Sequence, residues 1–288
     1  MIIENEFLQA EINAKGAELK SLKNTITHYE YMWGADPAYW AKTSPVLFPI
    51  VGALKDDTYY HEGKAYNLTR HGFARDFLFA EERLSDAEAV FSLSDNEKTR
   101  LHYPFAFRLS IRYRLEEDSL FCSYEVSNPE DRHTLPFSIG GHPAFAVGTD
   151  GNPPYHNHYL EFPDDDVLHC HLLEGNLITD RTITIPLENR RLLLRHELFY
   201  GDALVMKGLR SKQITLKNKV DERGIHFRHE GFPYFDIWAA KDADFVCLEP
   251  WCGIADGIQH NQQFDTKEGI QVLKAGETWR RGWEVACF

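Results

Sequence analysis

Apolar and polar residues alternate with a period of two along much of the chain. Residues 105–115 read FAFRLSIRYRL and residues 119–126 read SLFCSYEV, and the three residues between these runs are acidic. Strict alternation places apolar side chains on one face of a β-strand and polar side chains on the other. The two runs and their short polar link therefore predict a β-hairpin.

Similar short segments recur along the chain, and turn signals such as KG at 15–16 and AGE at 275–277 separate them. Helical signals are few: residues 94–97 can cap a short helix that ends near His102, and residues 35–40 predict another short turn. The predicted strands cover residues 8–12, 89–93, 159–162, 182–186, 213–216, 225–229, 235–239, 245–248 and 270–273.

The order of these elements predicts the fold class. Strands do not alternate with long helices, and no glycine-rich nucleotide-binding motif is present, which argues against a parallel sheet. The Pro- and His-rich stretch 152–157 predicts a long loop that could separate two domains, yet strand patterns of the same kind continue on both sides. We therefore predict one all-β domain over residues 1–288, a large antiparallel β-sandwich with a few short helices.

Composition narrows the choice of ligand. The chain contains 19 Phe, 13 Tyr and 6 Trp. Aromatic residues favour strands, and they also line sugar sites, because a pyranose ring presents an apolar face of C–H groups. The formal net charge of -13 argues against a nucleic-acid partner, since binding a polyanion needs clustered Lys and Arg.

The N-terminal sequence and the cysteines suggest a compartment. The first residues show no basic segment before an apolar run, and no stretch reaches the roughly 18 apolar residues that a membrane span needs. Five cysteines, an odd number without a secretion signal, predict reduced thiols and a cytoplasmic protein with no membrane partner. Their spacing does not form a zinc motif, so no metal is expected.

Two segments in the first third of the chain break the strand pattern. Residues 44–52 read SPVLFPIVG, and two prolines around an apolar run predict a rigid, buried wall rather than a regular central strand. Residues 70–76 read RHGFARD, with a histidine between two arginines beside a glycine. The guanidiniums could grip sugar hydroxyls or a phosphate, or the segment could be a turn with solvated charges.

Two further segments carry candidate acid–base groups. His142 in FSIGGHPAF (137–145) follows a glycine pair and precedes a proline, which would hold its imidazole at the edge of a cleft, although a lone histidine can also be structural. Glu249 in FVCLEPWC (245–252) closes an apolar run. A buried glutamate is rare unless it is paired or functional, and burial would make it a better base near neutral pH. An internal salt bridge would also explain it.

Taken together, these segments resemble the aldose 1-epimerase superfamily, and most closely its branch of LacX-like, galactose-mutarotase-related proteins. The matching motifs are RHGFARD, FSIGGHPAF and CLEPW (247–251), with SPVLFPIVG upstream, and the resemblance extends over nearly the whole chain. It implies a galactose mutarotase-like supersandwich with an open, concave sugar site and no cofactor. Gly141 and Pro143 flank the histidine where galactose mutarotases proper carry polar residues, so the identity of the sugar stays open.

The resemblance also implies roles for individual residues. His142 would be the general acid, Glu249 the general base, and His71 an assisting catalytic residue. The expected substrate-binding residues are charged or aromatic: Arg75, Arg70, Lys42, Lys55, Asp202 and Trp238. The match of Asp202 to the family is weaker than that of the catalytic residues, and Trp238 is inferred from its residue type alone.

The implied reaction interconverts the α and β anomers of an aldose or aldose phosphate. Glu249 would take the proton of the anomeric hydroxyl while a protonated His142 gives a proton to the ring oxygen, with the two groups on opposite edges of a sugar-sized hollow. The expected partner is a small sugar or sugar phosphate, and the protein would be a monomer or homodimer. A non-catalytic carbohydrate-binding or regulatory protein is the alternative on this fold. A glycoside hydrolase would need two carboxylates flanking the scissile bond.

Overall fold

The computed structural model describes residues 1–148 and 153–288. The first residue of the expected loop at 152–157 lies outside the described residues, and Tyr155–Asn157 form a short 3-10 helix, η3. The other helices are also short: α1 (Glu97–Arg100), η1 (Lys55–Asp57), η2 (Ala74–Asp76), η4 (His196–Phe199) and η5 (Phe264–Thr266). None of the helices in the described part of the chain has the length and apolar character that a membrane span requires.

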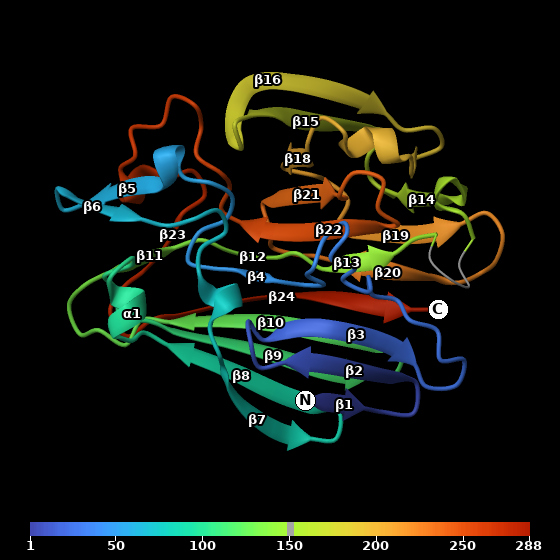
Figure 1. The fold of residues 1–288 in the computed structure, drawn as a ribbon, viewed down its shortest axis with the longest axis horizontal. Helices are drawn as coiled ribbons and strands as arrows, with labels where there is room; N and C mark the ends of the chain where they lie inside the picture. Colours follow the sequence, from blue (N-terminus) through green and yellow to red (C-terminus); the bar gives the residue numbers. More distant parts are fainter. Residues whose placement is uncertain (149–152) are drawn as a thin grey trace.

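One large sheet contains nine of the described strands, all paired antiparallel to their neighbours (Figure 1). Their order across the sheet is β17 (Arg191–Leu193), β14 (His158–Glu161), β19 (Gln213–Asn218), β20 (Gly224–Arg228), β24 (Thr278–Cys287), β10 (Ser119–Ser127), β9 (Arg108–Glu116), β8 (Glu88–Ser94) and β7 (Ala80–Ser85).

A second large sheet carries the residues of the candidate site. Its order is β16 (Leu177–Pro186), β15 (Val167–Glu174), β18 (Leu204–Lys207), β21 (Tyr234–Trp238), β22 (Phe245–Cys252), β12 (Ile139–Gly141) and β4 (Val46–Leu47), with β13 (Ala144–Ala146) also paired to β22. Smaller sheets join β1 (Ile2–Glu4), β2 (Leu8–Asn13) and β3 (Glu18–Asn24); β5 (Thr58–His61) and β6 (Lys64–Asn67); and β11 (Leu135–Phe137) and β23 (Gln271–Leu273).

The predicted hairpin is strands β9 and β10, which pair along their whole length from Glu116 and Ser119 onward. Along β9 buried residues recur at every second position, as the alternation of the sequence requires. Residues 105–107, which the pattern assigned to the same strand, precede it instead. The backbone of Phe107 bonds to Asp95 at this point, with its N–H donating to the carboxylate over 3.1 Å.

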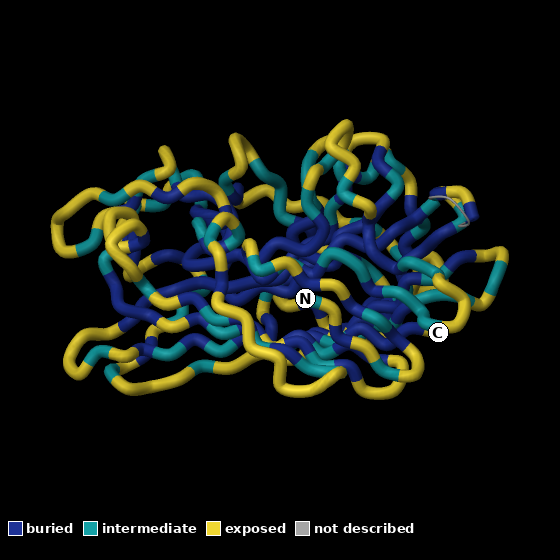
Figure 2. The backbone as a smooth tube through the Cα atoms, turned by 60° about the horizontal axis from the view of Figure 1, so that its bottom comes forward, coloured by how far each residue is buried: buried dark blue, intermediate teal, exposed yellow. Residues whose placement is uncertain are grey.

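The two large sheets face each other and share one apolar core. Phe227 of β20 packs against Phe235 of β21 and Phe145 of β13, with ring centroids 6.0 and 5.9 Å apart, and so joins one sheet to the other. Figure 2 shows buried backbone along the middle of the layers and exposed backbone at the turns. The predicted all-β antiparallel sandwich with few short helices is therefore confirmed.

Candidate functional site

His142 follows directly after strand β12, and the two preceding glycines allow its backbone to come close to buried aromatic residues. A Cβ atom on Gly140 would lie 2.6 Å from the Trp251 ring, and one on Gly141 would lie 2.7 Å from the Tyr124 hydroxyl. Contacts this short are sterically excluded for other residues. The glycine pair therefore lets the chain bring the His142 imidazole beside strand β22.

Glu249 lies in the middle of β22, where every residue is buried. Its Oε1 atom is 3.2 Å from Nε2 of His142, so the two residues that are far apart in the chain form one buried pair. The sequence analysis placed them on opposite edges of a hollow, whereas they contact each other directly. The register explains this proximity, because Gly140 of β12 pairs with Trp251 of β22, two residues beyond Glu249.

Burial shifts the pKa values of this pair in opposite directions. It lowers the pKa of His142 to about 3, with a further contribution from the positive charge of Arg70. It raises the pKa of Glu249 well above its ordinary value, and the neighbouring carboxylate of Asp236 adds to the increase. We expected a protonated His142 in the free protein, but desolvation favours neutral His142 and a protonated Glu249. The pair still holds one proton in total.

His71 lies against His142 in a turn with positive φ angles. Its φ angle is 69° and that of Gly72 is also 69°. A Cβ atom on Gly72 would lie 2.3 Å from the carbonyl oxygen of Phe48, so this position requires glycine. The His71 and His142 rings meet edge to face with centroids 5.8 Å apart. The RHG motif therefore holds a second imidazole next to the first.

Both ring nitrogens of His71 face N–H donors. The backbone N–H of Gly52 is directed at Nδ1 over 3.1 Å, and Nε of Arg70 is directed at Nε2 over 3.0 Å. Burial and nearby positive charges lower the pKa of His71 well below its ordinary value, so the ring is neutral. A neutral imidazole has only one accepting nitrogen. In one of the two contacts, the N–H of the ring therefore points at the N–H of the donor, and no hydrogen bond can form there.

A pocket opens beside these residues, between the turn that carries Arg70 and the second large sheet. It is lined by Gly52, Ala53, Arg70, His71, Leu173, Asn176, Ile178, Asp202, Ala203, Val205, Asp236, Trp251 and Ala255. Nη1 of Arg70 donates to the side chain of Asn176 over 2.9 Å and so bridges two of its walls. The φ angle of Asp202 is 154°, which is costly for a residue other than glycine. The structure thus brings Arg70, His71 and Asp202, three of the candidate residues, to one pocket.

Asp236 is a pocket residue that the sequence analysis did not identify. It lies on β21 directly opposite Glu249, so both side chains project from the same face of the sheet. It is buried, and its Oδ1 atom has no hydrogen-bond partner among the described residues. Burial and the charge of Asp202 raise its pKa well above its ordinary value. An aspartate within the apolar run FDIW was the sequence signal that could have indicated it.

Aromatic rings cover the other side of His142. Trp40 stacks on the imidazole with centroids 4.9 Å apart, and Trp238 meets it edge to face at 5.7 Å. Trp238 was expected near the sugar, whereas Trp40 was not identified. Trp40 is the last residue of the turn predicted at 35–40, and its backbone N–H donates to the carbonyl of Asp36. Both indoles cover the imidazole on this side, and neither lines the pocket described above.

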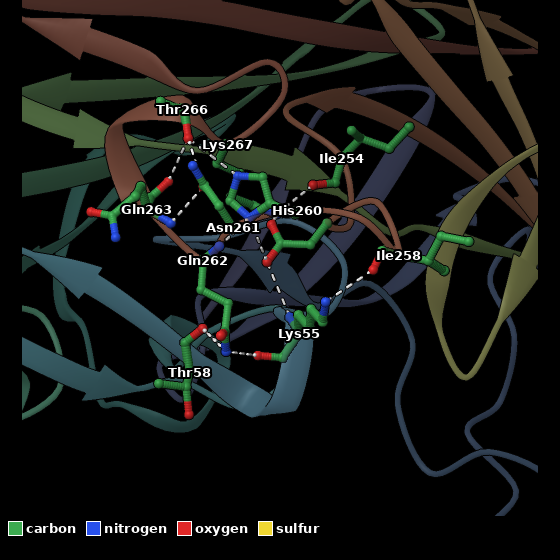
Figure 3. Close-up of polar contacts among 11 residues, drawn as sticks. Lys55, Thr58, Ile254, Ile258, His260, Asn261, Gln262, Gln263, Thr266 and Lys267 are labelled. Carbon is green, nitrogen blue, oxygen red and sulfur yellow. Dashed lines mark hydrogen bonds and ion pairs between the residues drawn. The ribbon is translucent and has the colours of Figure 1, made fainter.

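The remaining basic residues predicted to bind substrate, Lys42, Lys55 and Arg75, do not line the pocket, and each contacts another protein group. Lys42 lies 3.9 Å from the carboxylate of Asp76, and Arg75 donates to the backbone carbonyl of Arg70. Lys55 donates through its ammonium group to the carbonyl of Ile258 over 3.1 Å, as Figure 3 shows. Among the described residues that line the pocket, Arg70 is the one cation.

A buried ion pair supports the segment that continues from the pocket wall beyond Ala255. Nζ of Lys267 is 2.9 Å from Asp256 and also donates to the carbonyl of Ile254 over 2.6 Å (Figure 3). The backbone N–H of Lys55 donates to the second carboxylate oxygen of Asp256. Neither side chain of the pair is exposed. These bonds fix the backbone that presents Ala255 to the pocket.

Three side chains form a group that could hold a metal ion. Nε2 of His142, Sγ of Cys247 and a carboxylate oxygen of Glu249 lie within 4.8 Å of one another. Metal binding needs a thiolate. Burial raises the pKa of Cys247 well above its ordinary value, and the charge of Glu249 raises it further. The environment therefore favours the neutral thiol, which fits a metal poorly.

Comparisons with known proteins find similar sequences and structures. The family model described as Aldose 1-epimerase matches residues 1–285. The chromosomal protein LacX of Lactococcus lactis subsp. lactis is 29% identical over 99% of this chain and 98% of that protein. A galactose mutarotase related enzyme from Lactobacillus acidophilus superposes with a TM-score of 0.94 at 33% identity, covering 100% of this chain and 97% of that one. A galactose mutarotase-like protein from Lactobacillus casei gives 0.90 at 30% identity, with coverage of 100% and 99%.

Proposed function

The chain belongs to the aldose 1-epimerase family, and from this membership we propose that it is an isomerase that interconverts the α and β anomers of an aldose. The observation that carries the proposal is the buried contact of 3.2 Å between His142 and Glu249, beside a pocket lined by polar groups. A protein that only binds sugar needs no acid–base pair shielded from water.

The proposed reaction opens the sugar ring by moving two protons. In the state where His142 carries the shared proton, Glu249 takes the proton from the anomeric hydroxyl and His142 gives its proton to the ring oxygen. The C1–O5 bond breaks and an open-chain aldehyde forms. Rotation about C1–C2 presents the other face of the carbonyl to the O5 hydroxyl. Ring closure then returns both protons in the reverse direction.

The geometry supports this sequence of steps in two ways. The distance of 3.2 Å is short enough for a small side-chain rotation to align the two groups and pass the proton, since neither oxygen of Glu249 has another hydrogen-bond partner among the described residues. A pair that contains one proton can act as acid and base at once, in either direction. General acid–base groups each accelerate such a proton transfer by about 10² to 10⁴-fold. That range suits a reaction that already proceeds slowly in water.

The test removes each member of the pair without changing its size. We expect His142→Asn and Glu249→Gln each to lower kcat/KM for anomer exchange by about 10² to 10⁴-fold, and the double variant to lose little more. Exchange is followed by polarimetry or by saturation-transfer NMR on a panel of aldoses. Wild-type rates in either folded variant would reject the assignment.

A second histidine–carboxylate contact provides the matched control. Nε2 of His196 lies 3.2 Å from Asp244, and neither residue lines the pocket among the described residues. His196→Asn should therefore leave anomer exchange unchanged. If sugars bind to the wild-type protein without any acceleration of exchange, the alternative of a non-catalytic carbohydrate-binding protein is correct.

A further inference from the structure

The imidazole of His142 has a polar partner on one side only. Its Nε2 atom faces Glu249 at 3.2 Å, whereas Nδ1 is buried and has no hydrogen-bond partner in another described residue. In a working histidine, a hydrogen bond to the second ring nitrogen commonly sets the tautomer and the orientation of the ring. At His142 the orientation therefore depends on the rings that pack against it.

Trp40 lies nearly parallel to the imidazole of His142. The two ring planes are inclined by 26° with centroids 4.9 Å apart, whereas Trp238 meets the imidazole at 83° and 5.7 Å. A nearly parallel ring at this distance places the imidazole against the π face of the indole. Trp40 is not among the described residues that line the pocket. Its influence on the pocket therefore passes through His142.

Trp40 is itself held in place by its backbone and by a neighbouring ring. Its carbonyl accepts a hydrogen bond from Nε1 of Trp33 over 2.9 Å, and its backbone N–H donates to the carbonyl of Asp36 over 2.9 Å. The indole also stacks on Phe245, with centroids 5.5 Å apart and an angle of 25° between the planes. A ring that is restrained in this way can hold the imidazole of His142 in one orientation.

The π face of Trp40 distinguishes between the two protonation states of His142. An indole attracts a cation that lies within about 6 Å of its ring centroid, and the attraction is stronger when the pair is removed from water. His142 is 5% exposed and lies within this distance. The contact therefore favours the state in which His142 carries the shared proton. It acts against burial and the positive charge of Arg70, which favour the neutral ring.

We propose that Trp40 is a positioning residue for anomer exchange, whose indole face orients the His142 imidazole and stabilises its protonated form by a cation–π contact. The proposal rests on the proposed function, because it assumes that His142 is the acid of the reaction. It predicts an effect on the chemical step, since the protonated state gains from the contact and the neutral state does not. A residue that stacked on the sugar in every state would instead act on KM.

The first experiment compares side chains at position 40. Anomer exchange is measured by NMR over a range of concentrations of the aldose that the wild-type protein converts fastest. We expect Trp40→Leu, which removes the π face, to lower kcat by about 10- to 30-fold and to change KM by less than about twofold. Trp40→Phe, which keeps a smaller π face, should recover part of the loss. A loss mainly in KM, or no loss in a folded Trp40→Leu variant, would overturn the proposal.

The second experiment keeps the shape of the side chain and changes its electron density. Tryptophan analogues with one, two and three fluorine atoms on the ring are introduced at position 40 by suppression of a stop codon. Fluorine withdraws electrons from the π face and weakens its attraction for a cation. We expect kcat to fall stepwise along the series, by about 10-fold in total, with urea unfolding unchanged. A constant kcat would show that the ring only fills space, which overturns the proposal.

Trp279 provides the matched control. Its ring centroid lies 5.4 Å from the guanidinium carbon of Arg281, so it makes a cation–π contact of its own, and it is not one of the described lining residues of the pocket. The same fluorinated series at position 279 should leave kcat unchanged, and a decline equal to that at position 40 would contradict the proposal. If the wild-type protein accelerates exchange of no aldose, the proposed function and the role of Trp40 are both rejected.

Discussion

At the scale of single residues, the site depends on one proton shared between two buried groups. The pKa of His142 falls to about 3 while that of Glu249 rises well above its ordinary value. Between these two values the pair contains one proton, and outside them it contains two or none. Only the state with one proton can donate and accept at the same time.

This proton count predicts the pH dependence of the reaction. We expect kcat/KM to decline on the alkaline side as Glu249 ionises, because its pKa is raised, and to show no decline near pH 6.5 on the acidic side, because the pKa of His142 is lowered to about 3. In Asp236→Asn the alkaline decline should move to lower pH, because the charge of Asp236 raises the pKa of Glu249. The measurement is exchange NMR across pH, with the spontaneous rate subtracted. An acidic decline near pH 6.5, the ordinary pKa of histidine, would show that burial does not lower the pKa of His142.

The sequence allowed only some of these residues to be identified. His71, His142 and Glu249 stand in unusual local contexts, beside glycine, proline or an apolar run, and the structure brings all three together. Asp236 becomes a neighbour of Glu249 only through the pairing of two strands. Lys55 was selected for its charge, but the direction of its long side chain depends on the carbonyl of Ile258.

At the scale of elements, alternation located the strands that have one buried face. The strand β8 matched its predicted position to within a residue at each end. In contrast, β22 is buried on both faces and extends past Leu248 to Cys252, because its polar residue faces other protein groups instead of solvent. The strand β4 has only two residues, too few for a periodic pattern. Strands that build the site were therefore the least predictable ones.

The turn that carries His71 should be sensitive to a single methyl group. We expect Gly72→Ala to lower the free energy of unfolding by about 1–2 kcal/mol for its positive φ angle and by about 1–3 kcal/mol more for the overlap with Phe48. It should also reduce anomer exchange, because His71 must move. Urea unfolding and exchange NMR measure the two effects.

Gly63 is the matched control for this variant. Its φ angle of 76° resembles that of Gly72, but a Cβ atom there meets nothing within 4 Å. Gly63→Ala should therefore lose only the contribution of the positive φ angle, about 1–2 kcal/mol, and keep full activity. Equal losses for the two variants would show that the contact with Phe48 does not constrain the turn.

The segment beyond Ala255 should depend on its buried ion pair. Replacing Lys267 by Met leaves Asp256 buried with only His260, 3.3 Å away, to take over as counter-ion, and we expect a loss of up to about 3–5 kcal/mol of folding free energy at a pH where His260 is neutral. Urea unfolding measures the loss. The double variant Lys267→Met with Asp256→Leu should recover most of it, because no unpaired charge remains. A single variant as stable as the wild-type protein would mean that water reaches Asp256 in place of Lys267.

At the scale of the whole molecule, residues from both large sheets contribute to one continuous apolar core. The contacts of Phe227 with Phe145 and Phe235 tie the sheets together. We propose on this basis that residues 1–288 act as a single domain, the organisation that the uniform strand pattern predicts. Alternation alone could not show which strands are neighbours, because long-range pairing depends on register and twist.

A shared core predicts one cooperative unfolding transition. Chains longer than about 150 residues often unfold in steps, so this outcome is informative for a chain of 288 residues. Tryptophan fluorescence and far-UV circular dichroism should give coincident curves in urea, and calorimetry should give equal van't Hoff and calorimetric enthalpies. Two separated transitions would indicate two domains that unfold independently.

The contacts around His71 have a consequence for how tightly a sugar is held. The imidazole faces N–H donors from both Gly52 and Arg70 but can accept from only one of them. The backbone contact with Gly52 is fixed by the turn, so Arg70 is the donor left without an acceptor. A sugar oxygen that displaces the guanidinium could accept from both Arg70 and the ring N–H. Relief of this mismatch would then contribute to the affinity, and a structure solved with sugar should show Arg70 turned away from the ring.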